Sequence, residues 1–422
     1  MESDLISRSE VSARPAVSNL NSLLADIHVR YIALKREDFQ LHYRVFDEVF
    51  RILQRNMKAV DKYYERYVSN IQFAGSHFDN LRINKPDEFD MDIVIDVPVS
   101  MHTNPLDPAD SDILIETYRP EYLWLRAGTQ YRNLPNRDRQ DFQINKTAYD
   151  WLDKKNFILG SKFIVWFKSV GNRALNEFQK LNGRPVCYVD GVAYTIRSSS
   201  SGPAWTIHIE SEGFKLDVDL VPSLKFPESR WLGKKYRKIP AGCRREFWLA
   251  VPKPNPDAPP TPHEEQRSWR LALQDQEKQL LNHTYQLRQI IRLIKKFRDA
   301  QGMDKLASYY IKTIFFWEIA DLQNVQKGKK LRKKEAFWKQ NDIATLFKYM
   351  LQKFYDALEK KSIPFFWNRR KNYIQRWDID RLNEYKGKIN KLLNVLNNPS
   401  DYKSVAKYLL TDKEYQEYRK FL

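Results

Sequence analysis

Apolar and polar positions recur with two different periods along this chain, and the two periods predict helices and strands. A long amphipathic helix is predicted where apolar residues recur at intervals of three and four: Leu41, Val45, Phe46, Val49, Phe50 and Leu53. Strands are predicted where β-branched residues alternate with polar ones: Glu88 to Val97, Trp205 to Ile209 and Phe214 to Val221. Residues 147–178 lie between these strands and have a helical pattern.

The segment VPKPNPDAPPTP, which carries six prolines between Pro252 and Pro262, marks a change of pattern. A stretch this rich in proline predicts a stiff or irregular connector. Beyond it the chain is helical, with apolar periodicity at 280–297, 309–319, 343–358 and 382–396. We therefore expect an α+β fold of two lobes: a mixed-sheet lobe that carries the long N-terminal helix (21–262), and a helical lobe (263–422). Residues 1–20 are expected to be flexible.

Candidate chemistry lies where the first predicted strand begins. Gly75 and Ser76 follow an apolar run and predict a strand-to-helix turn whose backbone N–H groups can hold phosphates. Twelve positions after Ser76, Glu88 and Asp90 stand two apart, so both side chains share one face of an extended strand. Adjacent carboxylates repel unless a cation lies between them, and a pair of divalent metal ions is the usual solution in phosphoryl transfer.

Two metal ions require a third carboxylate from another strand. The segment KLDVDLVPS supplies Asp217 and Asp219 on one strand face, and spacing alone leaves both open. With three carboxylates, a ribose hydroxyl can attack the α-phosphate of a nucleoside triphosphate in line, with one ion lowering the pKa of the hydroxyl and the other stabilising pyrophosphate. The third carboxylate could also assist deprotonation of the hydroxyl. The residues thus predict nucleotidyl transfer on a two-lobed nucleotidyltransferase fold.

The composition indicates the class of protein and the compartment in which we expect it. With 42% hydrophobic and 29% charged residues, the chain has the make-up of a folded globular protein. No apolar run approaches the ~18 residues of a membrane span, and the first residues lack the apolar core of a secretory signal. Cys187 and Cys243 are the only cysteines, which fits a reducing compartment and excludes a multi-cysteine zinc site. We expect a cytoplasmic protein with no membrane partner.

The charge balance points to a polyanionic partner. The chain has 71 basic and 53 acidic residues, a net charge of +18. The basic residues are clustered, with aromatic residues close by, and the candidates for nucleic-acid contacts are Lys234, Lys235, Lys329, Lys330, Lys333 and Lys334. A solvated basic surface would have the same composition, but the clustering favours nucleic acid.

The residues around the turn resemble a known family. The stretch GSHFDNLRINKPDEFDMDIVIDVP (75–98) closely resembles the corresponding segment of the animal cyclic GMP–AMP synthase family, in particular its cyclic GMP–AMP synthase-like receptors. The likeness continues in order through VDLVPS (218–223), FWLAVPKP (247–254), RSWRLALQDQEKQLLN (267–282), LASYYIKTIFFWE (306–318) and KSIPFFWNRR (361–370). The resemblance therefore covers most of the chain.

The resemblance implies a role for each matching residue. Glu88, Asp90 and Asp219 would be the metal carboxylates, which selects Asp219 over Asp217, and would hold two Mg²⁺ or Mn²⁺ ions. The other matching residues would bind nucleotides. Gly75 and Ser76 would hold phosphates, Arg270 and Glu277 the guanine-side substrate, and Lys295 and Ser308 the donor phosphates, while Tyr309 would stack on a nucleobase.

Two departures from the family pattern refine this expectation. DNA-sensing members carry a His–Cys–Cys–Cys zinc insertion after the segment that ends at His283, and here no cysteine follows it. We therefore expect no zinc site, and the resemblance favours double-stranded RNA over DNA as activator, read through A-form backbone shape. Ala74 stands where a family member can carry threonine, which leaves the base preference open.

The predicted function is a nucleotidyltransferase that is activated by double-stranded RNA. It would join ATP and GTP into cyclic GMP–AMP, a second messenger of innate antiviral signalling, and it could act as a dimer on nucleic acid. Two other functions share many of these features: a template-independent linear polymerase of the oligoadenylate-synthase type, and a catalytically silent nucleic-acid-binding scaffold.

Overall fold

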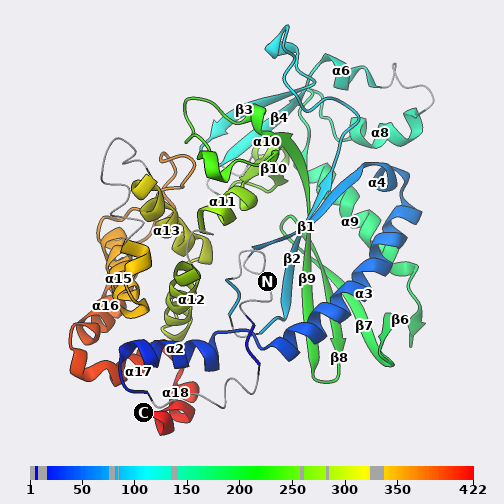
Figure 1. The fold of residues 1–422 in the computed structure, drawn as a ribbon. Coiled ribbons are helices and arrows are strands. Elements are labelled where there is room, and N and C mark those ends of the chain that lie inside the picture. Colours follow the sequence, from blue (N-terminus) through cyan, green and yellow to red (C-terminus); the bar gives the residue numbers. More distant parts are fainter. Residues whose placement is uncertain are drawn as a thin grey trace.

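The computed structural model describes residues 5–7, 17–75, 81–83, 85–134, 141–256, 261–281, 285–323 and 337–422. Several residues named above lie outside these ranges: Ser76, His283, Lys329, Lys330, Lys333 and Lys334. Figure 1 shows a sheet-based lobe on one side and a cluster of helices on the other, which is the predicted α+β architecture of two lobes.

Eleven strands form one sheet in the described part of the chain. They are β1 (Val68–Ala74), β2 (Glu88–Ile95), β3 (Ile113–Arg119), β4 (Tyr122–Ala127), β5 (Lys180–Leu181), β6 (Arg184–Val189), β7 (Val192–Ser201), β8 (Ala204–Ser211), β9 (Phe214–Pro227), β10 (Phe247–Pro252) and β11 (Trp269–Ala272). The main path runs β3-β4-β11-β10-β9-β8-β7-β6-β5, and β2 joins it through β9 while β1 pairs with β2.

The long strand β9 connects the parts of this sheet. Its first half pairs with β8 on one side and with β2 on the other, and its second half pairs with β10. The β2–β9 pairing is parallel, whereas the other ladders are antiparallel. The sheet is therefore mixed, as predicted, and its parallel pair places two acidic strand segments side by side.

Helices α3 (Arg36–Val60) and α9 (Gly160–Asn176) pack on each other beside the sheet. The predicted apolar stripe of α3 is buried at Val45, Phe46, Val49 and Leu53, whereas Leu41 is exposed. Short helices α4 (Lys62–Tyr67), α6 (Thr129–Arg132), α8 (Phe142–Asp150) and α10 (Pro262–Arg267) complete this lobe.

The prediction of helix across residues 147–178 was wrong over 151–159, where the chain forms a loop between α8 and α9. In this loop the Asp153 carboxylate accepts hydrogen bonds from the backbone N–H groups of Lys155 and Phe157. Asn156 has a φ of 65°, which a right-handed helix cannot contain. Short-range side-chain capping thus replaces the helical hydrogen bonds here.

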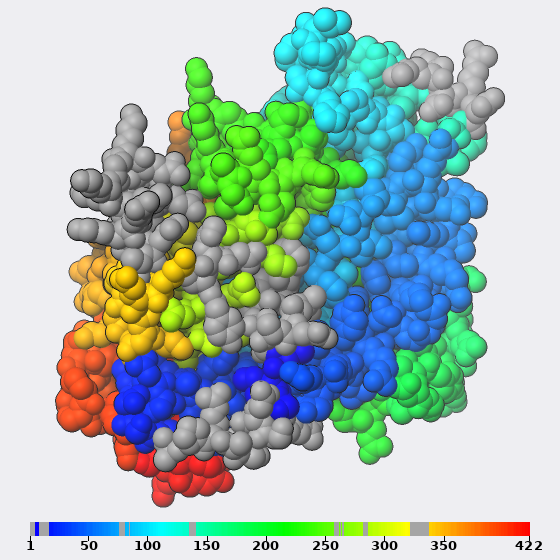
Figure 2. Space-filling view, viewed as in Figure 1, coloured from blue at the N-terminus to red at the C-terminus, as the bar shows by residue number. Residues whose placement is uncertain are grey.

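The helical lobe contains α11 (Gln274–Leu281), α12 (Tyr285–Ala300), α13 (Ser308–Gln323), α15 (Ile343–Glu359), α16 (Ile379–Leu396), α17 (Ala406–Leu409) and α18 (Asp412–Tyr418). Helix α2 (Leu20–Tyr31), although N-terminal, packs on α12 and α15 in this lobe. Figure 2 shows its blue surface against the orange and red C-terminal helices. None of the described helices has both the length and the apolar character needed to cross a bilayer.

Candidate active site

Three carboxylates converge where β2 and β9 lie side by side. Glu88 and Asp90 on β2 and Asp219 on β9 each offer an oxygen, and these oxygens all lie within 4.8 Å of one another. The strand register explains the convergence, because Asp90 is paired directly with Asp219 in the parallel β2–β9 ladder. Side chains at paired positions of neighbouring strands project from the same face of the sheet.

The neighbouring acid Asp217 has different partners. It accepts a hydrogen bond from His208 at 2.7 Å and forms an ion pair with Lys215 at 3.2 Å. These contacts hold the pKa of Asp217 below its usual range in spite of partial burial. Asp219 instead accepts a hydrogen bond from the Thr206 hydroxyl. The structure thus brings Asp219, and not Asp217, to the pair on β2.

The electrostatics of the cluster favour a bound cation. Burial and the neighbouring Glu88 and Asp219 charges raise the pKa of Asp90 to about 7. Arg82 forms ion pairs with Glu88 and with Asp87, and so supplies part of the missing positive charge. Three hard oxygen donors this close together suit Mg²⁺ or Mn²⁺, which prefer carboxylate ligands.

Gly75, at the end of β1, allows the backbone to approach the cluster. Its φ is +62°, and a Cβ at this position would lie 2.0 Å from Asp90 Oδ2. Only glycine meets both requirements without strain. The sequence prediction of a special turn at this position is therefore consistent with the backbone, while its second residue, Ser76, is outside the described ranges.

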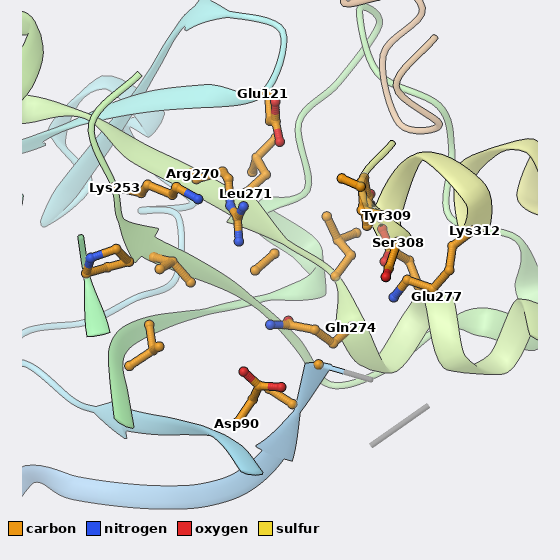
Figure 3. Close-up of a pocket in the computed structure, with 18 of the residues that line it drawn as sticks. Asp90, Glu121, Lys253, Arg270, Leu271, Gln274, Glu277, Ser308, Tyr309 and Lys312 are labelled. Atoms are coloured by element: carbon orange, nitrogen blue, oxygen red, sulfur yellow. Dashed lines mark hydrogen bonds between the residues drawn. The ribbon is translucent and has the colours of Figure 1, made fainter. Parts of the chain in front are cut away.

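A cavity of about 520 Å³ opens next to the carboxylates, between the sheet and the helical lobe. Several predicted nucleotide-binding residues line it together with Asp90: Gly75, Arg270, Glu277, Lys295, Ser308 and Tyr309. Figure 3 shows side chains from both lobes around this cavity, with Asp90 below Gln274 and Arg270.

Glu277 and Tyr309 are connected within the wall of this cavity. The Tyr309 hydroxyl donates to Glu277 Oε1 at 2.6 Å, and the Trp367 indole N–H donates to the same oxygen at 2.9 Å. The Tyr309 ring packs edge-on against Tyr373, with centroids 5.7 Å apart. These contacts hold the tyrosine ring in a fixed position at the cavity surface.

Lys295 and Ser308 lie on the helical side of the cavity. Lys295 Nζ donates to the Leu81 carbonyl oxygen at 2.7 Å and so links α12 to the segment that carries Arg82. Burial, helped by the nearby Arg298 charge, lowers the pKa of Lys295 to about 7. The Ser308 hydroxyl, at the start of α13, accepts a hydrogen bond from Arg298 at 2.9 Å.

The structure adds residues that sequence reasoning did not assign to the site: Asp92, Glu121, Lys253, Gln274 and Lys312 all line the cavity. Arg270 Nε is buried without a hydrogen-bond partner in the described part of the chain. Burial raises the pKa of Glu121, and the Arg270 charge lowers the pKa of Lys253. Only Asp92 had a sequence signal, its position two residues after Asp90 on the same strand face.

The two predicted nucleic-acid contacts that the structure describes lie away from the cavity. Lys234 and Lys235 are exposed in the loop after β9 and do not line the cavity. Cys187 and Cys243 are both buried free thiols.

Comparison with known proteins identifies the family. The Mab-21 protein nucleotidyltransferase domain matches residues 77–283, and the Mab-21 protein HhH/H2TH-like domain matches residues 286–391. A cyclic GMP-AMP synthase-like receptor of Ctenocephalides felis is 30% identical over 414 residues, covering 95% of this chain and 90% of the relative. The chain belongs to the cyclic GMP-AMP synthase-like receptor family. Receptors of Aethina tumida and Tribolium castaneum, at 27% and 28% identity, each match 94% of the chain.

Membership of this family makes the protein a nucleotidyltransferase with nucleotide substrates. Such enzymes typically use divalent metal, and the Glu88, Asp90 and Asp219 carboxylates provide a suitable donor set. The two matched domains meet between residues 283 and 286. The proline-rich segment lies earlier, and after it the chain contributes one more strand, β11, to the sheet.

Proposed function

We propose that this protein joins ATP and GTP into cyclic GMP–AMP when it is activated by double-stranded RNA, as part of innate antiviral signalling. The observation that carries the proposal is the carboxylate cluster of Glu88, Asp90 and Asp219 beside a cavity large enough for nucleotides. The relatives' printed name, cyclic GMP-AMP synthase-like receptor, supports this choice of product.

In this proposal, Glu88, Asp90 and Asp219 hold two Mg²⁺ or Mn²⁺ ions. Bound there, the ions would lower the pKa of the attacking hydroxyl and neutralise charge on the leaving pyrophosphate. A ribose hydroxyl oxygen forms a bond to the α-phosphorus of the donor nucleotide while the bond from that phosphorus to the bridging oxygen breaks. Asp219 would lie close to the attacking oxygen and would assist removal of its proton. A second transfer of the same kind would close the linear intermediate into a ring.

The cavity residues bind and orient the two nucleotides. The Gly75–Ser76 turn and the Lys295 and Ser308 side chains would hold the donor phosphates, since they offer N–H, ammonium and hydroxyl donors. Tyr309 would stack on a nucleobase, its ring fixed by Glu277 and Tyr373. Arg270, whose Nε lacks a partner in the described chain, would donate to the guanine-side substrate.

Activation is proposed to follow from binding of a long polyanion along basic surfaces. Lys234 and Lys235 are exposed and can contact phosphates, and the cluster at 329–334 would add further contacts. The metal ligand Glu88 is joined through Arg82 to the segment after the Gly75 turn, so a rearrangement of that segment would reach the cluster directly. In this proposal the protein could also act as a dimer assembled on the nucleic acid.

The test is an activity assay with purified protein, ATP, GTP and Mg²⁺ or Mn²⁺. Parallel reactions contain no nucleic acid, double-stranded DNA or double-stranded RNA, and mass spectrometry identifies the products. We expect a cyclic dinucleotide only with RNA, and none from the Asp219→Asn variant. A ladder of linear oligomers would instead assign the protein to the polymerases. Tight RNA binding without any product would favour the silent scaffold.

A further inference from the structure

Asp92 is a carboxylate in the nucleotide cavity that metal binding does not use. It follows Asp90 on the same face of β2, it is only 2% exposed, and it lines the cavity. The carboxylate group that can share a metal ion consists of Glu88, Asp90 and Asp219 among the described residues. A buried acid at a substrate surface needs a polar partner, and this one has Gln274.

The contact between Asp92 and Gln274 fixes the orientation of the glutamine amide. Gln274 Nε2 donates to Asp92 Oδ2 at 2.9 Å. Burial raises the pKa of Asp92 to about 7, so at pH 8 the group is a carboxylate that only accepts hydrogen bonds, and the amide turns its NH₂ group toward it. The second carboxylate oxygen of Asp92 and the Gln274 amide oxygen have no hydrogen-bond partner in the described part of the chain. The pair therefore offers two acceptors to a ligand.

The positively charged Arg270 side chain lies close to these acceptors. Figure 3 shows the Gln274 amide between Asp90 and Arg270, and the Arg270 guanidinium is near enough to Asp92 to interact with its charge. Arg270 Nε has no partner in the described chain. The cavity thus presents acceptors and guanidinium donors to one ligand.

Guanine matches this pattern and adenine does not. Guanine has two adjacent donors, N1–H and the 2-amino group, and it has acceptors at O6 and N7 that suit an arginine. Adenine has a donor, its 6-amino group, beside an acceptor, N1. Its N1 would therefore face an oxygen of Asp92 or Gln274, and two acceptors cannot form a hydrogen bond. A buried mismatch of this kind is what makes a polar site selective.

We propose that the Asp92–Gln274 pair is a specificity determinant that selects guanine over adenine for the nucleotide bound beside Arg270. The proposal rests on the proposed function, and it names the residues that decide which base this part of the cavity accepts. Asp92 reads the base through its free oxygen and also positions Gln274.

The first test measures binding without catalysis. Triphosphates with a methylene group between the α- and β-phosphorus cannot transfer their nucleotidyl group, so calorimetry with Mg²⁺ at pH 8, where Asp92 is ionised, reports affinity alone. We expect the guanosine compound to bind about tenfold more tightly than the inosine compound, which lacks the 2-amino group, and more tightly still than the adenosine compound. Equal affinity for the three bases would overturn the proposal. Because this assay needs no turnover, its result is independent of whether the protein makes a cyclic product.

The second test changes the pattern of donors and acceptors. In Asp92→Asn, two amides face each other, and whichever way they turn, the pair presents one donor and one acceptor. That pattern suits adenine, so the guanosine-to-adenosine affinity ratio should fall by about tenfold or more and could reverse. A role for Asp92 in bracing α11 alone would weaken both compounds equally and leave the ratio unchanged, which would also refute the proposal.

Asp275→Asn is the matched control. Asp275 follows Gln274 and its charge acts on Asp92, but it does not line the cavity. The substitution therefore removes one negative charge near Asp92 and leaves the Asp92–Gln274 hydrogen bond in place. The base ratio should stay at the wild-type value in this variant, and a change equal to that of Asp92→Asn would reduce the effect to general electrostatics.

Discussion

At the scale of single residues, Asp90 shows how the cluster of carboxylates lowers the stability of the folded protein. Burial beside Glu88 and Asp219 raises its pKa from 3.8 to about 7. Between these two pH values the folded protein holds a proton that the unfolded chain releases, so the free energy of unfolding falls as pH rises. At pH 8 Asp90 is ionised, and the metal-free protein carries the full electrostatic cost of its site.

Asp90→Asn should therefore stabilise the metal-free protein at pH 8 by about 1–3 kcal/mol, with little gain near pH 4, while removing catalysis. Thermal melts at both pH values, with and without Mg²⁺, would measure this. Asp217→Asn is the control with the opposite sign, because the contacts with His208 and Lys215 hold the pKa of Asp217 down and its ionised form is favoured. If both substitutions changed the thermal stability in the same direction at pH 8, the raised pKa of Asp90 would not explain the effect.

Gly75 is a second residue at which the site restricts the sequence, because there is no room for a side chain. Gly75→Ala places a methyl group 2.0 Å from Asp90 Oδ2, so the carboxylate must move and activity should fall at least about a hundredfold. Gly213→Ala is the matched control: it also has a positive φ, +69°, but its Cβ would meet no atom within 4 Å. It should lose about 1 kcal/mol of stability and keep its activity. Comparable activity loss in both variants would mean that backbone strain alone explains the effect.

Residue spacing located two members of this carboxylate cluster, and only the resemblance to the receptor family selected the third, Asp219. Alternation along a strand put Glu88 and Asp90 on one face, whereas spacing could not choose between Asp217 and Asp219. That choice depends on the β2–β9 register and on His208, which reaches Asp217 from another strand. The pairing of Asp92 with Gln274 joins residues 182 positions apart, so no local pattern could predict it.

At the scale of elements, helix α9 depends on a close approach to the sheet. Gly171 is buried in this helix, and a Cβ there would lie 2.7 Å from the Trp205 ring on β8. The indole N–H of Trp205 donates to Asn172 at 3.0 Å, which hinders retreat of the ring. A helix-favouring alanine is therefore excluded by packing at this position.

Gly171→Ala should accordingly destabilise the protein by about 1–3 kcal/mol. Gly387→Ala in α16 makes the same chemical change at an exposed position with no atom within 4 Å of the added Cβ, so it should stabilise the helix by about 0.5–1 kcal/mol. Denaturant unfolding of both variants measures the difference. Stabilisation by both substitutions would show that α9 can shift away from Trp205.

At the scale of the whole molecule, the two lobes are less separate than the sequence pattern predicts. The periodicity identified the helices and several strands, since these patterns are local. It could not show that α2 packs on the C-terminal helices, where Asn21 donates to Asp342 at 2.8 Å. Nor could it show that the chain returns to the sheet as β11. Contacts between segments hundreds of residues apart depend on complementary surfaces, which a single sequence does not reveal.

Charge is the other property of the whole molecule, and it gives a prediction for the activator. With a net charge of +18, affinity for the proposed activator, double-stranded RNA, should fall steeply as salt rises, because phosphate contacts release counterions. Changing Lys329, Lys330, Lys333 and Lys334 together to glutamate should flatten the slope of log affinity against log salt and reduce RNA-dependent activity at least about tenfold. Fluorescence anisotropy with RNA at several salt concentrations measures the slope.

The control for this variant must make the same change in net charge. Glutamate at four exposed lysines that are not among the candidate nucleic-acid contacts does so: Lys58, Lys154, Lys391 and Lys413. If the net field of the molecule were sufficient for binding, both variants would lose the same affinity, since long-range attraction depends on total charge. If the lysines at 329–334 contact phosphates, only the variant that changes them should show a much flatter dependence of log affinity on log salt. Unchanged activation of the cluster variant by every nucleic acid would place the binding face elsewhere, with exposed Lys234 and Lys235 as the next candidates.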